Sequence, residues 1–156
     1  MNIQKYHLSL DNESIFNKCT ELYSSDNFQL EYSPILIDAV HNFHMLENQP
    51  HTWEEFSPLV RLLDSVSTTA ITRSWFNIMD RGSSVKAHDH ARATELVCVY
   101  YALYDASHPP LEFRINDIWT PYEFIQGDCI VFPKHLVHRV QVQESSNIRC
   151  SIAFNM

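Results

Sequence analysis

The chain has 156 residues, of which 45% are hydrophobic and 19% charged, a balance typical of one globular domain and not of a disordered chain. Its net charge of −8 and its lack of a Lys/Arg stripe argue against a nucleic-acid partner. No apolar run approaches the roughly eighteen residues that span a bilayer, and the N-terminal residues do not resemble a secretory leader. We therefore expect a cytoplasmic location and no membrane partner.

Three amphipathic helices are predicted in the first third of the chain. Apolar residues recur with a 3.6-residue period over residues 12–24, after Asp11 or Asn12 as a candidate N-cap. A second stripe covers residues 35–46 after a Ser-Pro pair, and a third helix follows another Ser-Pro pair at residues 57–58. We expect residues 1–68 to form a helical support layer without chemistry of its own.

From about residue 69 the pattern changes to a period of two, with β-branched and aromatic residues between turn signals. Short strands without helices between them favour an antiparallel sandwich or barrel of the jelly-roll type. The chain is predicted to be a single domain, residues 1–156, with a β core over residues 69–156. The expected strands lie near 70–79, 85–91, 95–104, 111–115, 121–125, 128–133, 137–143 and 147–155.

Glycine and cysteine each lead to one local prediction. The two glycines, Gly82 and Gly127, are expected at turns that need a positive φ. The four cysteines are widely spaced without a CxxC pair, and we interpret them as buried, reduced thiols.

A histidine pattern indicates a metal site. His88 and His90 are two residues apart in a strand-like stretch, so both imidazoles are expected on one face, with Asp89 on the other. Two neutral imidazoles form half of a metal site, and His138 on a later strand is the expected third ligand. The combination of the HxH pair, the glycines and this downstream histidine favours a metal over a pair of surface histidines.

Arg149 and Ser151 share one face of the last predicted strand, opposite its apolar face. An Arg that turns inward needs an anion, and its planar fork suits a carboxylate. An edge-strand Arg whose charge lies in solvent is the other interpretation of the same pattern.

Four more residues are candidates for the lining of the site: Trp75, Asn77, Tyr100 and Tyr101. Only one of the adjacent tyrosines can face inward. Aromatic residues on strands are more often part of the core.

Several stretches together resemble the short bacterial and phage 2-oxoglutarate/Fe(II)-dependent oxygenases of the prolyl-hydroxylase-like branch. They are residues 75–82, 88–90, 99–101, 127–133, 138–140 and 149–155, in the family's order and with plausible spacings. The resemblance implies a double-stranded β-helix with helices packed outside. It also implies that Fe(II) is bound by His88 and His138, that residue 90 fills the position usually held by Asp or Glu, and that 2-oxoglutarate is the co-substrate. Arg149 would pair with its distal carboxylate beside Ser151, and the substrate would be an unidentified small molecule or peptide.

The sequence departs from the family at the metal, because the usual motif is HxD or HxE and here it is HxH. Three neutral ligands leave ferrous iron with a charge of +2 instead of +1. Such a site still binds an anionic co-substrate, and the departure bears on oxidative activity more than on metal binding.

Cupins are a second resemblance with the same barrel. Gly82, His88, His90 and Glu95 meet the first cupin pattern, and Gly127, Pro133 and His138 meet most of the second. The alternative function is therefore a cupin-type metalloprotein: a three-histidine dioxygenase, an isomerase or a ligand-binding barrel. On this alternative Glu95 is a fourth ligand. Any metal requires neutral imidazoles, so we expect the metal affinity to fall below about pH 6.

Overall fold

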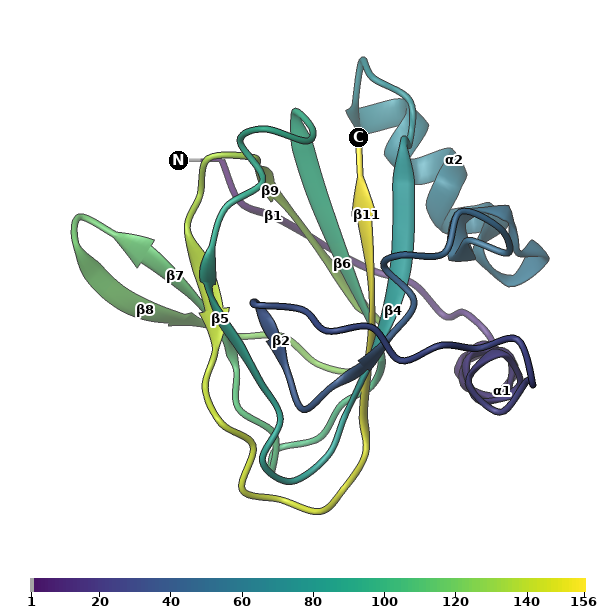
Figure 1. Cartoon of the computed structure of the whole chain (residues 1–156). Coiled ribbons are helices and arrows are strands. Elements are labelled where there is room, and N and C mark those ends of the chain that lie inside the picture. The colour runs from purple at the N-terminus through teal and green to yellow at the C-terminus, as the bar shows by residue number, and fades with distance from the viewer. Residues whose placement is uncertain (1) are drawn as a thin grey trace.

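Two antiparallel sheets face each other in the computed structural model, which describes residues 2–156 (Figure 1). The first sheet has the order β1-β9-β6-β11-β4-β3, and the second has the order β2-β5-β10-β7-β8. The strands of the first are β1 (Gln4–His7), β9 (Asp128–Pro133), β6 (Leu96–Leu103), β11 (Arg149–Asn155), β4 (Arg73–Met79) and β3 (Val40–His41). Those of the second are β2 (Leu36–Ile37), β5 (Ser84–His88), β10 (His138–Val140), β7 (Leu111–Ile115) and β8 (Ile118–Tyr122). The mainly β, double-stranded β-helix fold with N-terminal helices is confirmed.

Helices cover the outer face of the six-stranded sheet (Figure 1). Helix α1 (Asn12–Tyr23) begins after Asp11, whose side chain accepts a hydrogen bond from the Ser14 backbone N–H at 3.0 Å. Helix α2 (Ser57–Val66) follows two short 3₁₀ turns, Pro50–Thr52 and Glu54–Phe56. The helices predicted at 12–24 and after residue 57 are thus confirmed.

Both faces of the six-stranded sheet are buried, which explains its nearly continuous apolar strands. Alternate residues such as Tyr100 and Ile152 pack against α1 and α2 in one hydrophobic cluster. Their neighbours, such as Tyr101, point the other way into the space between the sheets, where a second cluster lies. The interior of the barrel is therefore built by every second residue of these strands.

The helix predicted at residues 35–46 is wrong, and residues 1–68 are not purely helical. Leu36 pairs with Val85 on the second sheet, whereas Val40 pairs with Ile78 on the first, and Asp38 makes the turn between them with φ 49°. Residues of this stripe thus pair with strands of two different sheets, and strand pairing overrides the helical period. β1 was also missed. The assignment of the whole chain to a single domain stays a prediction.

The strand predictions near 70–79, 95–104, 111–115, 128–133 and 147–155 match observed strands, and the others differ at their ends. The strand expected at 121–125 is β8, which begins at Ile118. Asn116 and Asp117 both have positive φ, at 50° and 63°, and form the two-residue turn that places Ile115 opposite Ile118. β5 ends at His88 instead of continuing to residue 91.

The glycine and cysteine predictions are confirmed. Gly82 and Gly127 have φ of 90° and 89°. A Cβ on Gly127 would also lie 2.9 Å from Cε1 of His7 and 3.1 Å from the Leu8 carbonyl oxygen, so a side chain here would crowd its neighbours as well as strain the backbone. All four cysteines are free and buried. Within residues 2–156, none of the helices has both the length and the apolar character needed to cross a membrane.

Candidate metal centre

The register between two neighbouring strands brings His88 and His138 together. β10 pairs with β5 so that His138 lies directly opposite His88, and their ring centroids are 4.2 Å apart. His138 is buried and packs against Phe132, with ring centroids 4.8 Å apart. The strand pairing therefore fixes two of the three predicted ligands.

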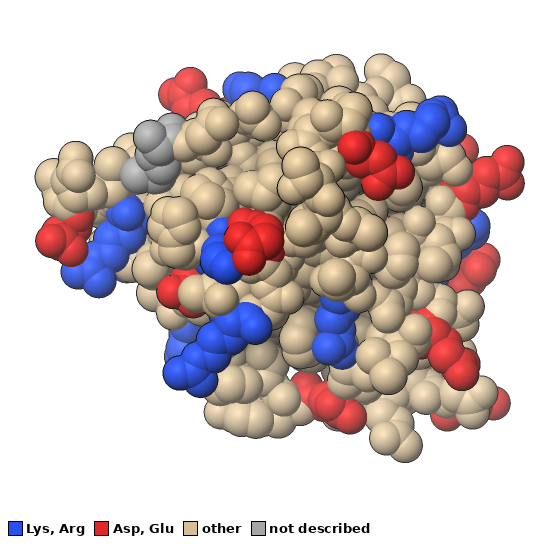
Figure 2. Space-filling view, turned by 90° about the horizontal axis from the view of Figure 1, so that it is seen from above, with Lys and Arg blue, Asp and Glu red and all other residues tan. Residues whose placement is uncertain are grey.

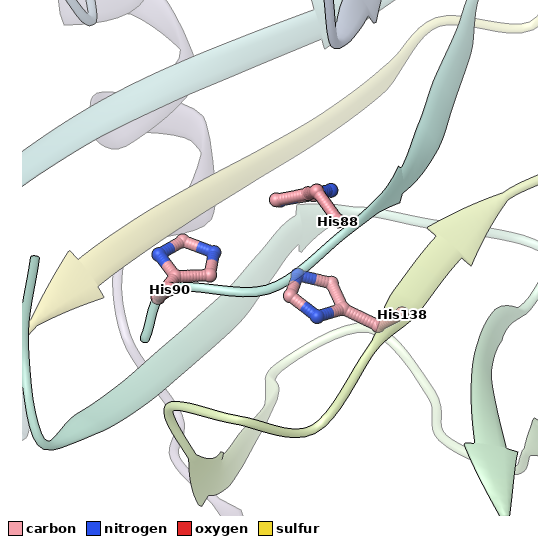
Figure 3. A group of neighbouring side chains, drawn as sticks. All are labelled: His88, His90 and His138. Atoms are coloured by element: carbon pink, nitrogen blue, oxygen red, sulfur yellow. The ribbon is translucent and has the colours of Figure 1, made fainter. Parts of the chain in front are cut away.

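His90 reaches the same point from a loop and not from a strand. It lies two residues beyond the end of β5, and its backbone N–H donates to the Lys134 carbonyl at 2.8 Å. Its ring centroid is 5.1 Å from that of His88 and 5.2 Å from that of His138 (Figure 3). One ring nitrogen from each histidine lies within 4.8 Å of the others. The three rings converge, as predicted. However, His90 lies beyond the end of β5, so the alternation of side chains along one strand does not explain why it reaches the other two.

The hydrogen bonds of the three rings leave the same nitrogen free. Nδ1 of His88 is 2.8 Å from the Lys86 carbonyl, and Nδ1 of His138 is 2.9 Å from the Leu136 carbonyl. A carbonyl only accepts, so each Nδ1 carries the proton and each Nε2 keeps its lone pair. Nδ1 of His90 is 3.0 Å from Oδ1 of Asn155, which has the same consequence. Three Nε2 lone pairs are thus available to one ion.

Burial keeps these imidazoles neutral. Desolvation lowers the pKa of His88 and lowers that of His138 well below its ordinary value. Desolvation and then the neighbouring His88 lower the pKa of His90 to about 4. The rings therefore need not lose protons before they bind a metal near neutral pH. Because protons compete with the metal only below these lowered pKa values, we expect the metal affinity to fall at a pH lower than 6.

Arg149 faces the interior of the barrel. It is 1% exposed and lines a small cavity of about 60 Å³ that the three histidines also line. Its Nη1 is 3.6 Å from Sδ of Met79, and its guanidinium carbon lies 5.5 Å from the ring centroid of Tyr101 and 5.8 Å from that of Tyr104. None of the ion pairs found within residues 2–156 includes Arg149. A cation is therefore buried here without an anion.

Three buried polar atoms of residues that line this cavity have no hydrogen-bond partner in the described part of the chain: Nε of Arg149, the hydroxyl of Tyr101 and Oδ1 of Asn77. Ser151 lies opposite Asn77 in the β4–β11 register and lines the same cavity. Buried polar atoms are nearly always paired, so a group of unpaired ones in one cavity indicates the place of a polar ligand.

The other predicted site residues fall into two groups: Trp75 and Tyr101 line the cavity, whereas Tyr100 and Glu95 do not. Trp75 lines the cavity and lies nearly parallel to His90, with an interplanar angle of 18° and ring centroids 6.1 Å apart. Tyr101 is the inward tyrosine, whereas the hydroxyl of Tyr100 bonds to Asn12 on the helix side. Glu95, the possible fourth ligand on the cupin alternative, does not join the histidines: its side chain is 63% exposed and pairs with Nζ of Lys134 at 2.6 Å. The fourth ligand of the cupin pattern is therefore absent from the group.

A second, larger pocket of about 480 Å³ opens on the outer side of His88 and His90. Its walls include Ile35, Phe43 and Trp75. The guanidinium of Arg73 lies 4.2 Å from the ring centroid of Phe43, and Trp75 meets this ring edge-on at 4.9 Å. His88 and His90 thus lie between the small cavity that holds Arg149 and this larger pocket.

Sequence reasoning gave no role to Phe43 or Asn155. Phe43 lies in the segment that was misassigned as helix. Asn155 belongs to the stretch 149–155 that carried the resemblance, so that stretch was the available signal.

On the face seen in Figure 2, Lys and Arg are scattered among Asp and Glu and form no single patch.

No family model and no curated protein matches the chain. Solved structures do. One is a 2OG-Fe(II) oxygenase family oxidoreductase from Burkholderia pseudomallei, with TM-score 0.54 and 18% identity over 64% of this chain and 51% of that one. Another is a prolyl-4-hydroxylase from Pseudomonas putida, with TM-score 0.70 and 12% identity over 98% and 90%. HygX from Streptomyces hygroscopicus, solved with nickel and 2-oxoglutarate, has TM-score 0.69 and 11% identity over 97% and 81%.

This chain spans about half the length of the Burkholderia protein and most of the length of the other two. At these identities the likeness establishes the fold, which is the one that the resemblance in the sequence implies.

Proposed function

We propose that the protein is an Fe(II)- and 2-oxoglutarate-dependent oxygenase that oxidises a small molecule or a peptide. The observation that carries the proposal is Arg149, a buried cation without an anion, in the same cavity as three histidines with free Nε2 lone pairs. A dicarboxylate can satisfy both ends of this cavity at once, since one carboxylate suits the guanidinium and the other suits a metal ion.

The residues fit the metal. His88, His90 and His138 would hold it through Nε2, and neutral imidazole is a suitable ligand for ferrous iron. When bound, iron supplies the redox chemistry that couples the decarboxylation of 2-oxoglutarate by O₂ to the oxidation of a substrate. The protein's own contribution is to fix the three rings through their Nδ1 hydrogen bonds and to keep them unprotonated by burial.

The residues also fit the co-substrate. Arg149 would bind the distal carboxylate in a bidentate manner, and the Tyr101 hydroxyl and the Asn77 amide would gain the partners that they lack. Ser151 would donate beside them. Tyr101 also packs against Phe124, with ring centroids 3.9 Å apart, which holds its ring in place.

The substrate would enter the pocket of about 480 Å³ next to His88 and His90. This volume suits a small molecule or one side chain of a peptide. Phe43 and Trp75 offer it an apolar, aromatic wall. Binding there would place a substrate C–H bond beside the metal by proximity alone.

A three-histidine dioxygenase without 2-oxoglutarate is the second candidate. The observation that favours it is His90, because a third imidazole stands where oxygenases of the resembled family usually have a carboxylate. On this candidate a substrate carboxylate, and not a co-substrate, would pair with Arg149.

Calorimetry separates the two candidates. Nickel replaces iron so that oxygen does no chemistry, and 2-oxoglutarate is titrated into metal-loaded and metal-free protein. We expect metal-dependent binding that succinate, which lacks the keto group, does not reproduce at equal concentration. An iron-loaded sample in oxygen should then release succinate from 2-oxoglutarate. If metal-loaded protein fails to bind 2-oxoglutarate, the proposal is rejected and the second candidate stands.

A further inference from the structure

The three histidines differ in how their rings are held. His88 and His138 bond to the carbonyls of residues 86 and 136, each two positions earlier in the same segment. His90 has no such local acceptor for Nδ1 in the structure. Within residues 2–156, its only side-chain hydrogen bond is to Asn155, 65 residues away on β11. Its orientation therefore depends on a single remote side chain.

Packing alone does not orient this ring. The ring of His90 lies nearly parallel to Trp75 at 18° and to His138 at 14°. A rotation of 180° about the Cβ–Cγ bond keeps the plane of the ring and both contacts. It exchanges Nδ1 with Cδ2 and Nε2 with Cε1, so the ligand position would be occupied by a carbon. Only the hydrogen bond to Asn155 distinguishes the two orientations.

Asn155 is well placed to do this. It is 3% exposed, and its backbone is fixed on both sides, opposite Val97 on β6 and Arg73 on β4. Its carbonyl also accepts from the backbone N–H of Thr72 at 2.8 Å. The side chain therefore starts from a rigid point of the sheet, as a positioning group requires.

We propose that Asn155 is a positioning residue that selects the Nδ1–H tautomer and the orientation in which Nε2 of His90 faces the metal. This inference rests on the metal site of the proposed function. In a site with an aspartate at position 90 no such group would be needed, because either carboxylate oxygen can ligate. With a histidine at position 90, a hydrogen-bond acceptor for Nδ1 is needed to keep Nε2 toward the metal, and Asn155 supplies it.

The side-chain amide of Asn155 allows an experiment that distinguishes a positioning role from a structural one. An Asn can present either Oδ1 or Nδ2, and an Nδ2 donor would select the other tautomer, with a proton on Nε2 that blocks the metal. An Asp presents acceptors only. Asn155→Asp should therefore keep its metal affinity, whereas Asn155→Leu, of similar size, should bind the metal more weakly. A merely structural Asn predicts the reverse order, because a buried carboxylate is harder to accommodate than a leucine.

The test measures the affinity for Co²⁺ by titration and the tautomer of His90 by ¹⁵N NMR of the metal-free protein. We expect the affinity of Asn155→Leu to fall by about ten-fold or more, and that of Asn155→Asp to stay within about three-fold of the wild type. Asn42→Leu is the matched control, since Asn42 is fully buried and bonds to the Phe76 N–H instead of a histidine. If Asn155→Leu does not fold, Asn155→Ala takes its place.

Two results would overturn the proposal: equal Co²⁺ affinity in Asn155→Leu and wild type, or an unchanged His90 tautomer in Asn155→Leu. Neither readout uses 2-oxoglutarate or turnover. A protein that binds Co²⁺ with the predicted order of variants but ignores 2-oxoglutarate would reject the proposed oxygenase and keep the role of Asn155.

Discussion

Replacement of Arg149 by Met should raise the stability of the ligand-free protein and abolish the binding of 2-oxoglutarate. The two effects have opposite signs because the guanidinium is 1% exposed and has no anionic partner until a ligand arrives. Met has a similar length and suits the surroundings of Met79 and Tyr101.

The magnitudes follow from this burial. Even a buried ion pair can often be replaced by apolar residues with a gain of about 1–4 kcal/mol or no loss, and a buried charge without a partner has no Coulombic attraction to lose. For a chain of this length, about 2 kcal/mol corresponds to a Tm increase of about 4–8 °C. Loss of one partner of a buried, hydrogen-bonded charge pair costs about 3 kcal/mol, so the affinity of the nickel-loaded protein for 2-oxoglutarate should fall by about 100-fold or more.

Thermal unfolding and calorimetry measure the two effects on the same samples. Arg114→Met is the matched control, because Arg114 is half exposed and paired with Asp117 at 2.9 Å; both quantities should stay near their wild-type values. Arg149→Lys should bind 2-oxoglutarate with intermediate affinity, since it keeps the charge but loses the fork. A variant Arg149→Met that is less stable yet binds 2-oxoglutarate normally would refute the reasoning and make the arginine a structural residue.

Three further outcomes are expected. His138→Ala should remove bound metal, measured by elemental analysis after dialysis; full metal content would exclude His138 as a ligand. Glu95→Gln should leave the metal content unchanged and alter the stability by less than about 1 kcal/mol, because only an exposed ion pair is lost; loss of metal would restore the cupin interpretation. Metal-free protein should lose stability as the pH falls from about 6.5 to about 4. The unfolded chain takes up a proton on His90 below its ordinary pKa, whereas the folded state does so only near the lowered pKa of about 4, a difference of up to about 3 kcal/mol. Chemical denaturation at pH 7, 5.5 and 4.5 measures this, and a flat profile would contradict the assigned burial of the ring.

Local patterns were sufficient where one segment decides its own structure. The alternation of β11 predicted that Arg149 and Ser151 share a face, and Gly82 and Gly127 predicted two turns with positive φ. The candidate N-caps Asp11 and Asn12 predicted the start of α1, and the structure has Asp11 as the cap. In each case the controlling interactions lie within a few residues of sequence, so the sequence alone is enough to read them.

Patterns failed where a distant partner decides. The stripe at residues 35–46 has a helical period, yet Leu36 and Val40 each pair with a different sheet. Glu95 has the spacing of a cupin ligand, but its carboxylate turns outward to Lys134. Neither pairing leaves a signal within the segment itself.

The sequence by itself determined a β-rich barrel, the three histidines as a set and the two faces of the last strand. It did so because pleat periodicity and side-chain chemistry are local properties. The tertiary structure decided that Arg149 faces inward without an anion, that His90 approaches from a loop and that Asn155 holds its ring. These depend on contacts between strands far apart in the chain, and the burial and hydrogen bonding of a side chain are set only when those strands close around it.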